Sequence, residues 1–447
     1  MKAFHFLFAL VQAARNNGLY YDTGTLHLRA GPVELKKLFH RAGEFSRYFV
    51  LVALAVSFCL SGCAATPPSD DKALVSAAAL EAKLQALSEK ALSYLSQLPP
   101  DSLAIPRALR ADGSLHATGS KDWTSGFYPG ELWQLYEFSK KDELAAAAAA
   151  WTAFVEKEKY DTHTHDLGFK IYCSFGQGFR LTDDPGYKKV ILEASRTLIQ
   201  RYNEKVGCIR SWDFNAETWQ FPVIIDNMMN LEMLFAATRL SGDSTYYKIA
   251  YQHALTTLNN HIREDHSAYH VIDYDTLTGE VRHWHTHQGA GPASAWARGQ
   301  AWNIYGFAMA YRETRDKRFL EQAKAAARFF YTHPNLPQDH IPYWDFDAPY
   351  IPNEPRDASA AAITACGLLM LCELDPPNRE QFLKWADSTL VSLNSDKYQS
   401  AALPFLLGHS VGSIPGAFEI DVPIIYADYY YVEALMKRLA LAKSNNG

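Results

Sequence analysis

The sequence is poor in the features that mark several specialised classes of protein. Six cysteines in 447 residues are too few for a disulfide-built scaffold. Basic residues do not outnumber acidic ones, and the formal net charge of −6 argues against a nucleic-acid partner. What the chain does have is an apolar fraction of 48%, which excludes a disordered chain and is ordinary for a globular protein.

Residues 1–62 have the pattern of a targeting segment. Basic residues precede the apolar run 48–60, which is too short for a membrane span and has the length of a signal-peptide core. The run ends in Leu60-Ser61-Gly62-Cys63, which resembles the lipobox of bacterial lipoproteins. We predict a lipoprotein signal peptide at 1–62 with an extended N-terminal lead, then a lipidated Cys63 and a flexible tether at 63–72. An ordinary secretory signal with a chance cysteine is the alternative.

Such processing would place an exported lipoprotein in the periplasm or at the outer membrane of a Gram-negative bacterium, touching the membrane only through its lipid anchor. Residues 1–62 carry seven Lys+Arg and three Asp+Glu, so the mature chain would have a net charge of −10. An acidic protein that handles an anionic substrate must place its positive groups locally. The four cysteines beyond Cys63 are expected to be small buried hydrophobic residues, with no essential disulfide: Cys173, Cys208, Cys366 and Cys372.

Apolar residues recur at helical spacing in segment after segment, which predicts twelve helices. The expected ranges are 71–98, 127–140, 142–157, 169–182, 185–203, 226–241, 243–262, 298–315, 317–333, 357–374, 378–394 and 424–441. Every second connection is a tight turn containing aspartate, where Asp and Pro should stop one helix and cap the next. The other connections are long. Helix pairs joined in this alternation predict one all-α domain over 73–447, an (α/α)6 toroid or six-hairpin barrel.

A long α-solenoid is the rival architecture, but it would not explain why residues capable of chemistry gather in one class of loop. Long loops in a compact domain are usually functional. Seven of the ten tryptophans lie in the long loops or in the first turn after one: Trp123, Trp212, Trp219, Trp284, Trp296, Trp302 and Trp344. Aromatic faces in a cleft stack on the C–H faces of sugar rings, although about half of these rings are expected simply to fill the mouth of the toroid.

Two aspartates stand out because each directly precedes a predicted helix on this loop side. Asp166 lies in HTHDLGF, and Asp226 follows three apolar residues in VIIDNMMN. Helix capping is the simpler role for either residue alone. As a pair, apolar surroundings and a neighbouring carboxylate would raise one pKa and keep that acid protonated near neutral pH.

Alternating histidines in the loop 263–297 raise the question of a metal site. His283, His285 and His287 could join His163 and His165, but no fixed ligand spacing is present, so we favour hydrogen-bonding histidines in a polar cleft and predict no metal or other cofactor. A cation at a helix start, Arg298, suggests a partner anion such as a substrate carboxylate. The alternative is a structural ion pair with a loop aspartate; Arg356 and Asp357 are expected to form such a pair with each other.

The strings HDLGF, IIDNMMN, HQG followed by SAWARGQAW, and PRDASAAA resemble the unsaturated glucuronyl hydrolases of glycoside hydrolase family 88, from about residue 122 to residue 431. The resemblance implies the same toroid and an activity that removes the 4,5-unsaturated uronic acid from the non-reducing end of oligosaccharides cut by lyases. It also implies hydration of the C4=C5 enol ether: an acid protonates C4, water adds at C5, and the resulting hemiketal opens and releases the aglycone.

The resemblance assigns roles to residues at the matching positions. Asp226 is the expected acid/base and Asp166 its partner. Substrate-binding positions are Trp123, His270, Gln288, Arg298 and Trp302, with Trp284 and Thr286 in the same loop. Ser410 and Ser413 match a Ser-x-x-Ser-x-Lys loop of members that favour sulfated fragments, but Pro415 replaces the lysine here, which puts that preference in doubt.

Two other functions remain open from the sequence. The neighbouring unsaturated rhamnogalacturonyl hydrolases share the toroid and the hydration chemistry, although HDLGF and WARGQAW argue against them. A non-catalytic surface lipoprotein that binds glycans through a tryptophan-rich cleft is the non-enzymatic alternative.

Overall fold

The computed structural model describes residues 19–22, 25–28, 75–101 and 103–444, and the chain divides into two units, Met1–Ser69 and Asp70–Gly447. In the first unit, β1 (Leu19–Asp22) pairs antiparallel with β2 (Thr25–Leu28). The predicted signal peptide core, Cys63 and the tether lie outside the described residues. Within the described part, no single helix has the length and hydropathy of a membrane span, although Ala358–Leu374 and Pro376–Leu393 reach them together as a pair bent by 120°.

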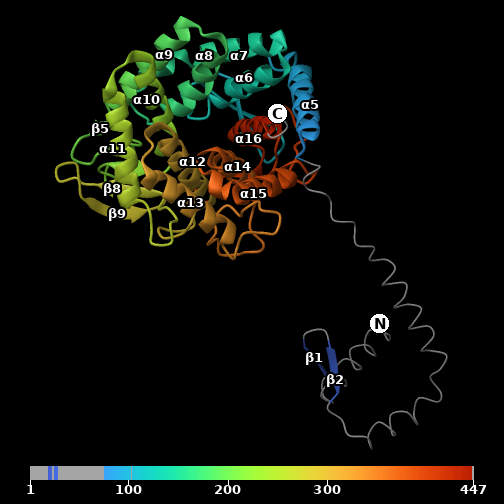
Figure 1. Ribbon diagram of the computed structural model, residues 1–447. Helices are drawn as coiled ribbons and strands as arrows, with labels where there is room; N and C mark the ends of the chain where they lie inside the picture. The colour runs from blue at the N-terminus through green and yellow to red at the C-terminus, as the bar shows by residue number, and fades with distance from the viewer. Residues whose placement is uncertain (1–18, 23–24, 29–74, 102, 445–447) are drawn as a thin grey trace, which may run out of the picture. The chain divides into compact units, whose positions relative to one another are not determined.

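The second unit is a closed double ring of helices (Figure 1). The inner helices are α6 (Phe127–Ser139), η3 (Gly168–Gly176) continuing into α8 (Gln177–Thr182), α10 (Asn227–Ser241), α12 (Ala297–Thr314), α14 (Ala358–Leu374) and α16 (Ile425–Ser444). Each inner helix packs on the next, and α16 packs back on α6 to close the ring. The predicted (α/α)6 toroid is therefore confirmed.

The outer helices are α7 (Asp142–Val155), α9 (Pro185–Ile199), α11 (Ser244–Asn260), α13 (Lys317–Thr332), α15 (Arg379–Leu393) and α5 (Ala77–Leu95). The sequences of the two kinds of helix explain which ring each belongs to. The outer helix α13 buries only one apolar stripe, whereas the inner helix α14 buries nearly every side chain. The sixth hairpin is made by the two ends of the domain, since the first helix α5 packs against the last helix α16. Short 3₁₀ turns follow α7 (η2, Glu156–Tyr160) and precede α15 (η4, Pro376–Asn378).

Three tight turns cap the next helix as predicted. Asp184, Asp243 and Asp316 each accept a hydrogen bond from the backbone N–H two residues later. The prediction is wrong at the other two turns: Lys141 precedes α7 and leaves Asp142 inside its first turn, and the Asp375 carboxylate accepts from the Asn378 side chain.

The long loops carry short strands that the helical periodicity did not reveal. The pairs are β3 (Ile105–Leu109) with β4 (Leu115–Thr118), β5 (Tyr202–Asn203) with β6 (Cys208–Ile209), and β10 (Ser410–Ser413) with β11 (Phe418–Val422). A three-stranded sheet joins β7 (Pro222–Ile224), β8 (Val271–Tyr274) and β9 (Val281–His285), with Ile224 opposite Val271 and Val271 opposite His285. This sheet draws the loops before α10 and α12 together.

A second difference lies at η3. The sequence predicts one α-helix over 169–182, but residues 168–176 form a π-helix before α8 begins. Such stretches are rare and frequent at functional sites. This one begins two residues after Asp166, against the start of α10.

Candidate active site

The N-terminal ends of the inner helices meet where the long loops cover the ring, and Asp166 and Asp226 lie at two neighbouring ends. The close approach is made by Gly168, where an added Cβ would lie 2.6 Å from Cα of Asn230. The side-chain oxygen of Asn230 accepts a hydrogen bond of 3.0 Å from the Phe169 amide. These contacts bring the segment after Asp166 onto the first turn after Asp226.

Neither aspartate caps a helix, so the simpler role weighed for each is not observed. The Asp226 side chain makes no capping hydrogen bond, and its buried Oδ2 has no hydrogen-bond partner in the described structure. Asp166 accepts a hydrogen bond of 2.8 Å from the Thr164 hydroxyl and lies 3.2 Å from Nε2 of His165. Asp226 is thus a buried carboxyl group with an unused oxygen, whereas Asp166 is held in place.

Burial gives Asp226 the protonation state of an acid. The residue is 8% exposed, and desolvation raises its pKa to about 7. The positive charge of Arg298 opposes that rise, whereas the negative charge of Asp166 adds to it. The predicted effect of a second carboxylate is therefore present, and burial is the larger cause.

The sheet places His270 beside this carboxyl group, because the Ile225 amide donates to the His270 carbonyl. Nδ1 of His270 accepts from the backbone amides of His287 (3.1 Å) and Gln288 (3.3 Å), which assigns the ring proton to Nε2. Burial holds the pKa of His270 well below its usual value, so the ring is neutral. Nε2 has no partner and lies 3.8 Å from Oδ2 of Asp226, too far for a hydrogen bond. The Nε2–H group of His270 is thus a hydrogen-bond donor held in a fixed position near the Asp226 carboxyl group.

Arg298 is bonded to the protein on two of its three nitrogens. Its guanidinium pairs with Asp357 at 3.2 Å and donates to the carbonyls of Val411 and Gly412, the latter at 2.8 Å. The residue is 1% exposed. The predicted contact between Arg298 and a substrate carboxylate stays a prediction, and the structural alternative, an ion pair with a loop aspartate, is observed. The expected Arg356–Asp357 pair is wrong, because Arg356 pairs with Asp339 and Asp357 is taken by Arg298.

The other predicted binding residues divide between the loop 285–288 and strand β10. The Thr286 hydroxyl lies 3.2 Å from Nδ1 of His270, and the Gln288 side chain donates to the Gly412 carbonyl at 3.1 Å. Ser410 and Ser413 are buried in β10, and the Ser413 hydroxyl accepts from the Gly416 amide at 3.0 Å. Arg298 and Gln288 thus converge on one carbonyl of β10, a link that no sequence pattern indicated.

The predicted tryptophans differ in how much ring they offer to a ligand. Trp123 is half-buried and packs against Phe127, Phe169 and Tyr426. Trp302 is 0% exposed, and its indole lies against Asp226 and lowers the pKa of that carboxyl. Trp284 is 48% exposed. Of the seven loop-side rings, five are buried, more than the half expected: Trp212, Trp219, Trp296, Trp302 and Trp344.

The alternating histidines pack on aromatic rings more than the sequence suggested. His283 stacks on Trp219 with ring centroids 5.4 Å apart, and His287 contacts Trp212 at 5.5 Å. His285 accepts a hydrogen bond from the Thr286 amide at 2.8 Å. Among the described residues, no three His, Cys, Asp or Glu side chains are grouped as a metal ion would require.

The loop end of the toroid thus holds a protonatable carboxyl group among aromatic side chains, an arrangement suited to acid catalysis on a sugar. The chain belongs to Glycosyl Hydrolase Family 88, whose family model matches residues 108–343. A Formosa agariphila protein named unsaturated glucuronyl hydrolase is 46% identical over 396 residues, which are 88% of this chain and 97% of that protein.

Solved structures agree with this family. The crystal structure of an unsaturated glucuronyl hydrolase specific for heparin is 44% identical, with a TM-score of 0.79 over 81% of this chain and 98% of its own. A UGL variant with dGlcA-Glc-Rha-Glc is 30% identical, with a TM-score of 0.73 over 78% of this chain and 94% of its own. The sequence resemblance to family 88 is confirmed, and the chain is a glycoside hydrolase.

Proposed function

We propose that this hydrolase removes the 4,5-unsaturated uronic acid from the non-reducing end of lyase-generated oligosaccharides by hydrating the C4=C5 enol ether. The observation that carries the mechanism is the buried Asp226 carboxyl group, which makes no helix-capping hydrogen bond and has a pKa raised to about 7. A carboxylic acid protonated at neutral pH is the group that an alkene carbon needs as its proton donor.

In this mechanism Asp226 transfers its proton to C4, and positive charge develops at C5 and the ring oxygen. The adjacent Asp166 carboxylate and the positive charge of Arg298 set the field around the acid. Water adds through its oxygen to C5 and returns a proton to Asp226. The hemiketal opens, the bond from C1 to the aglycone oxygen breaks, and the catalyst ends in its starting protonation state.

The neutral His270 ring serves as a hydrogen-bond donor in this scheme. Two backbone amides occupy Nδ1, so the Nε2–H can donate to the substrate or to Asp226 once it is ionised. Donation to the ionised form would stabilise Asp226 after it has given up its proton.

The test is the ultraviolet absorbance of the conjugated double bond. We expect it to disappear when the protein is mixed with an unsaturated glucuronyl disaccharide, with release of the second sugar in equal amount. Retained absorbance with bound sugar would support the non-catalytic alternative. A panel of unsaturated chondroitin, heparin and rhamnogalacturonan disaccharides separates the glucuronyl from the rhamnogalacturonyl activity.

We further propose that the chain is exported as a lipoprotein anchored through Cys63, in the periplasm or outer membrane of a Gram-negative bacterium. The support is the sequence LSGC after an apolar run with basic residues before it. Processing at Cys63 should be blocked by globomycin, whereas cleavage elsewhere without lipid would contradict the proposal.

A further inference from the structure

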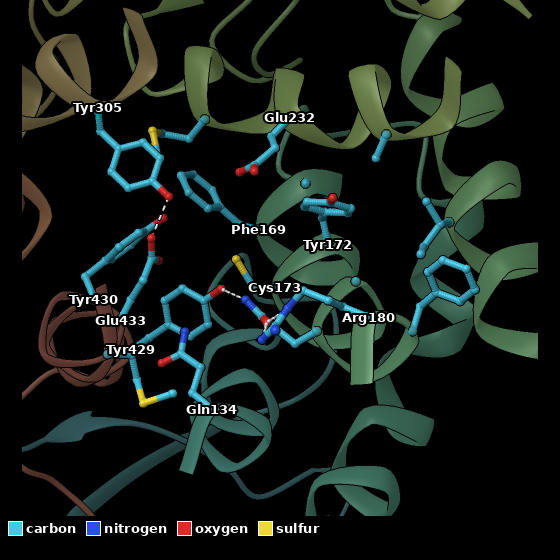
Figure 2. Close-up of a pocket in the computed structure, with 18 of the residues that line it drawn as sticks. Gln134, Phe169, Tyr172, Cys173, Arg180, Glu232, Tyr305, Tyr429, Tyr430 and Glu433 are labelled. Atoms are coloured by element: carbon cyan, nitrogen blue, oxygen red, sulfur yellow. Dashed lines mark hydrogen bonds between the residues drawn. The ribbon is translucent and has the colours of Figure 1, made fainter. Parts of the chain in front are cut away.

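A cavity of about 620 Å³ lies inside the ring, along the inner helices. Figure 2 shows side chains that line it. Its lining comes from α6, η3, α8, α10, α12 and α16, mostly from positions a turn or more beyond the helix starts, with Ile191 added by the outer helix α9. Asp166, Asp226 and His270 do not line it. Its volume falls within the range of about 300–1,000 Å³ that is typical of small-molecule sites.

Packed aromatic rings separate this cavity from the proposed active site. Phe169 and Tyr430 line the cavity, and Trp302, which does not, packs against each with ring centroids 5.4 Å apart. Because the Trp302 indole lies against Asp226, these rings are shared as a wall by the two sites. A ligand in the cavity would not touch the catalytic carboxyl group.

The charged residues that line the cavity are already in ion pairs, six of them with one another and Arg239 with Glu313, which lies outside the lining. Arg180 binds Glu137 at 2.5 Å, and Arg312 binds Glu232 at 2.5 Å. Lys437 and Glu433 complete a third pair at 3.4 Å. A charged ligand would have to break such a pair, so the cavity favours an uncharged ligand that forms hydrogen bonds.

Gln134 has a side-chain amide that such a ligand could hydrogen-bond. Its side chain is 3% exposed and lines the cavity, and neither its amide nitrogen nor its amide oxygen has a hydrogen-bond partner in the described structure. A buried amide without partners costs about 1–3 kcal/mol, which a bound group that both donates and accepts would recover. A sugar carries such pairs on neighbouring carbons, and the half-buried ring of Tyr172, which lines the cavity, can pack on its C–H surface (Figure 2).

We infer that this cavity is a second ligand site, separate from the catalytic one, for a neutral polyhydroxy compound of the size of a mono- or disaccharide. The inference is independent of the proposed reaction. Water filling the cavity is the competing occupant, since polar cavities of this size hold ordered water.

The probes are D-glucose and N-acetyl-D-glucosamine, which carry no conjugated double bond, with D-glucuronate as the charged comparison. Calorimetry should give saturable binding of a neutral sugar to the wild-type chain, and at least tenfold weaker binding of D-glucuronate. Gln134→Met, which keeps the volume but removes the amide, and Ala236→Phe, which fills the cavity, should each weaken neutral-sugar binding tenfold or more. Trp123→Ala, at the catalytic end, should leave it unchanged.

Thermal melts establish that each variant is folded before binding is compared. Absence of saturable binding to the wild-type chain would overturn the inference, as would equal affinity in Gln134→Met and Ala236→Phe. Crystals grown with the sugar that show only water in the cavity would also overturn it. Loss of binding in Trp123→Ala, with the cavity variants unaffected, would move the sugar to the catalytic end and equally reject the second site.

Discussion

Asp226 stands before a helix, as Asp184, Asp243 and Asp316 do, but its backbone differs. The three capping aspartates have ψ between 112° and 118°, which turns the side chain back towards the free amides of the first turn. Asp226 has ψ −29°, already helical, and its carboxyl group is directed elsewhere. The residue type alone does not separate an aspartate that caps a helix from one that does not; the backbone conformation does.

Replacing Asp226 by asparagine tests the acid directly. We expect Asp226→Asn to lower kcat by about 100- to 10,000-fold, because the amide keeps the shape but has no transferable proton. The variant should melt at or above the wild-type temperature at pH 8, where the buried native carboxylate is charged. Near-wild-type turnover of the folded variant would reject the assignment.

The raised pKa of Asp226 also predicts how activity depends on pH. In the proposed mechanism the protonated form is the active one; it is lost as the pH rises through about 7, so kcat/KM should fall roughly tenfold per unit above that value. Stability should follow the same direction. An acid whose folded pKa is raised contributes stability that is complete below its unfolded pKa, near 4, and is lost as the pH rises through about 7.

The matched control for this dependence is Asp226→Asn itself. Its free energy of unfolding should fall less than that of the wild type between pH 5 and pH 8, and each unit of pKa shift corresponds to about 1.4 kcal/mol. Parallel stability curves for the two proteins would show that Asp226 is not the titrating group.

At the scale of elements, the hairpin β10–β11 is held against the helical ring by side chains of another loop and helix. Arg298 at the start of α12 and Gln288 before it both donate to the Gly412 carbonyl, while Asp357 at the start of α14 holds the guanidinium. The resemblance assigned Arg298 to substrate binding. Its contacts indicate that it also positions the strand carrying Ser410 and Ser413.

Arg298→Lys keeps the charge but removes the forked donor geometry. We expect faster amide hydrogen exchange across 410–422 and a lower melting temperature. A role through β10 alone would lower kcat/KM by the same factor for free-acid and methyl-esterified uronate substrates. A loss confined to the free-acid substrate would instead show that Arg298 binds the substrate carboxylate.

At the scale of the whole molecule, the ring closes through its ends. The helix α5, which begins at Ala77, packs on α16 and α6, so the first and last helices form the sixth hairpin (Figure 1). Each inner helix starts after a long loop, and the partial positive charges of six helix N-termini therefore face the end where an anionic sugar would bind.

Two truncations test this closure. Removal of residues 1–72 should leave the melting temperature and kcat unchanged, because the described ring begins after that segment. Removal of residues 1–98, which also deletes α5, should abolish cooperative melting because it exposes apolar side chains of α16 and α6. Loss of activity in the shorter truncation would mean that the N-terminal segment contributes to the fold.

The number and order of the helices could be predicted from the sequence because the apolar residues that each helix buries recur along the chain with the helical period. The π-helix after Asp166 and the short strands could not, because their conformations depend on contacts such as that of Gly168 with Asn230, which join residues far apart in the chain. The motif resemblance indicated Asp226 and Asp166 as a pair, and the apolar residues before Asp226 indicated the direction of its pKa shift.

The sequence by itself determined the ring of hairpins, the family and the two aspartates at its loop end, because periodicity and motifs are local properties of the chain. Only the tertiary structure decided which aspartates cap helices, which groups Arg298 hydrogen-bonds, and that a neutral His270 lies beside Asp226. These are properties of burial and of partners brought from distant loops, and desolvation, which raises the pKa of Asp226, arises only when the ring closes around it.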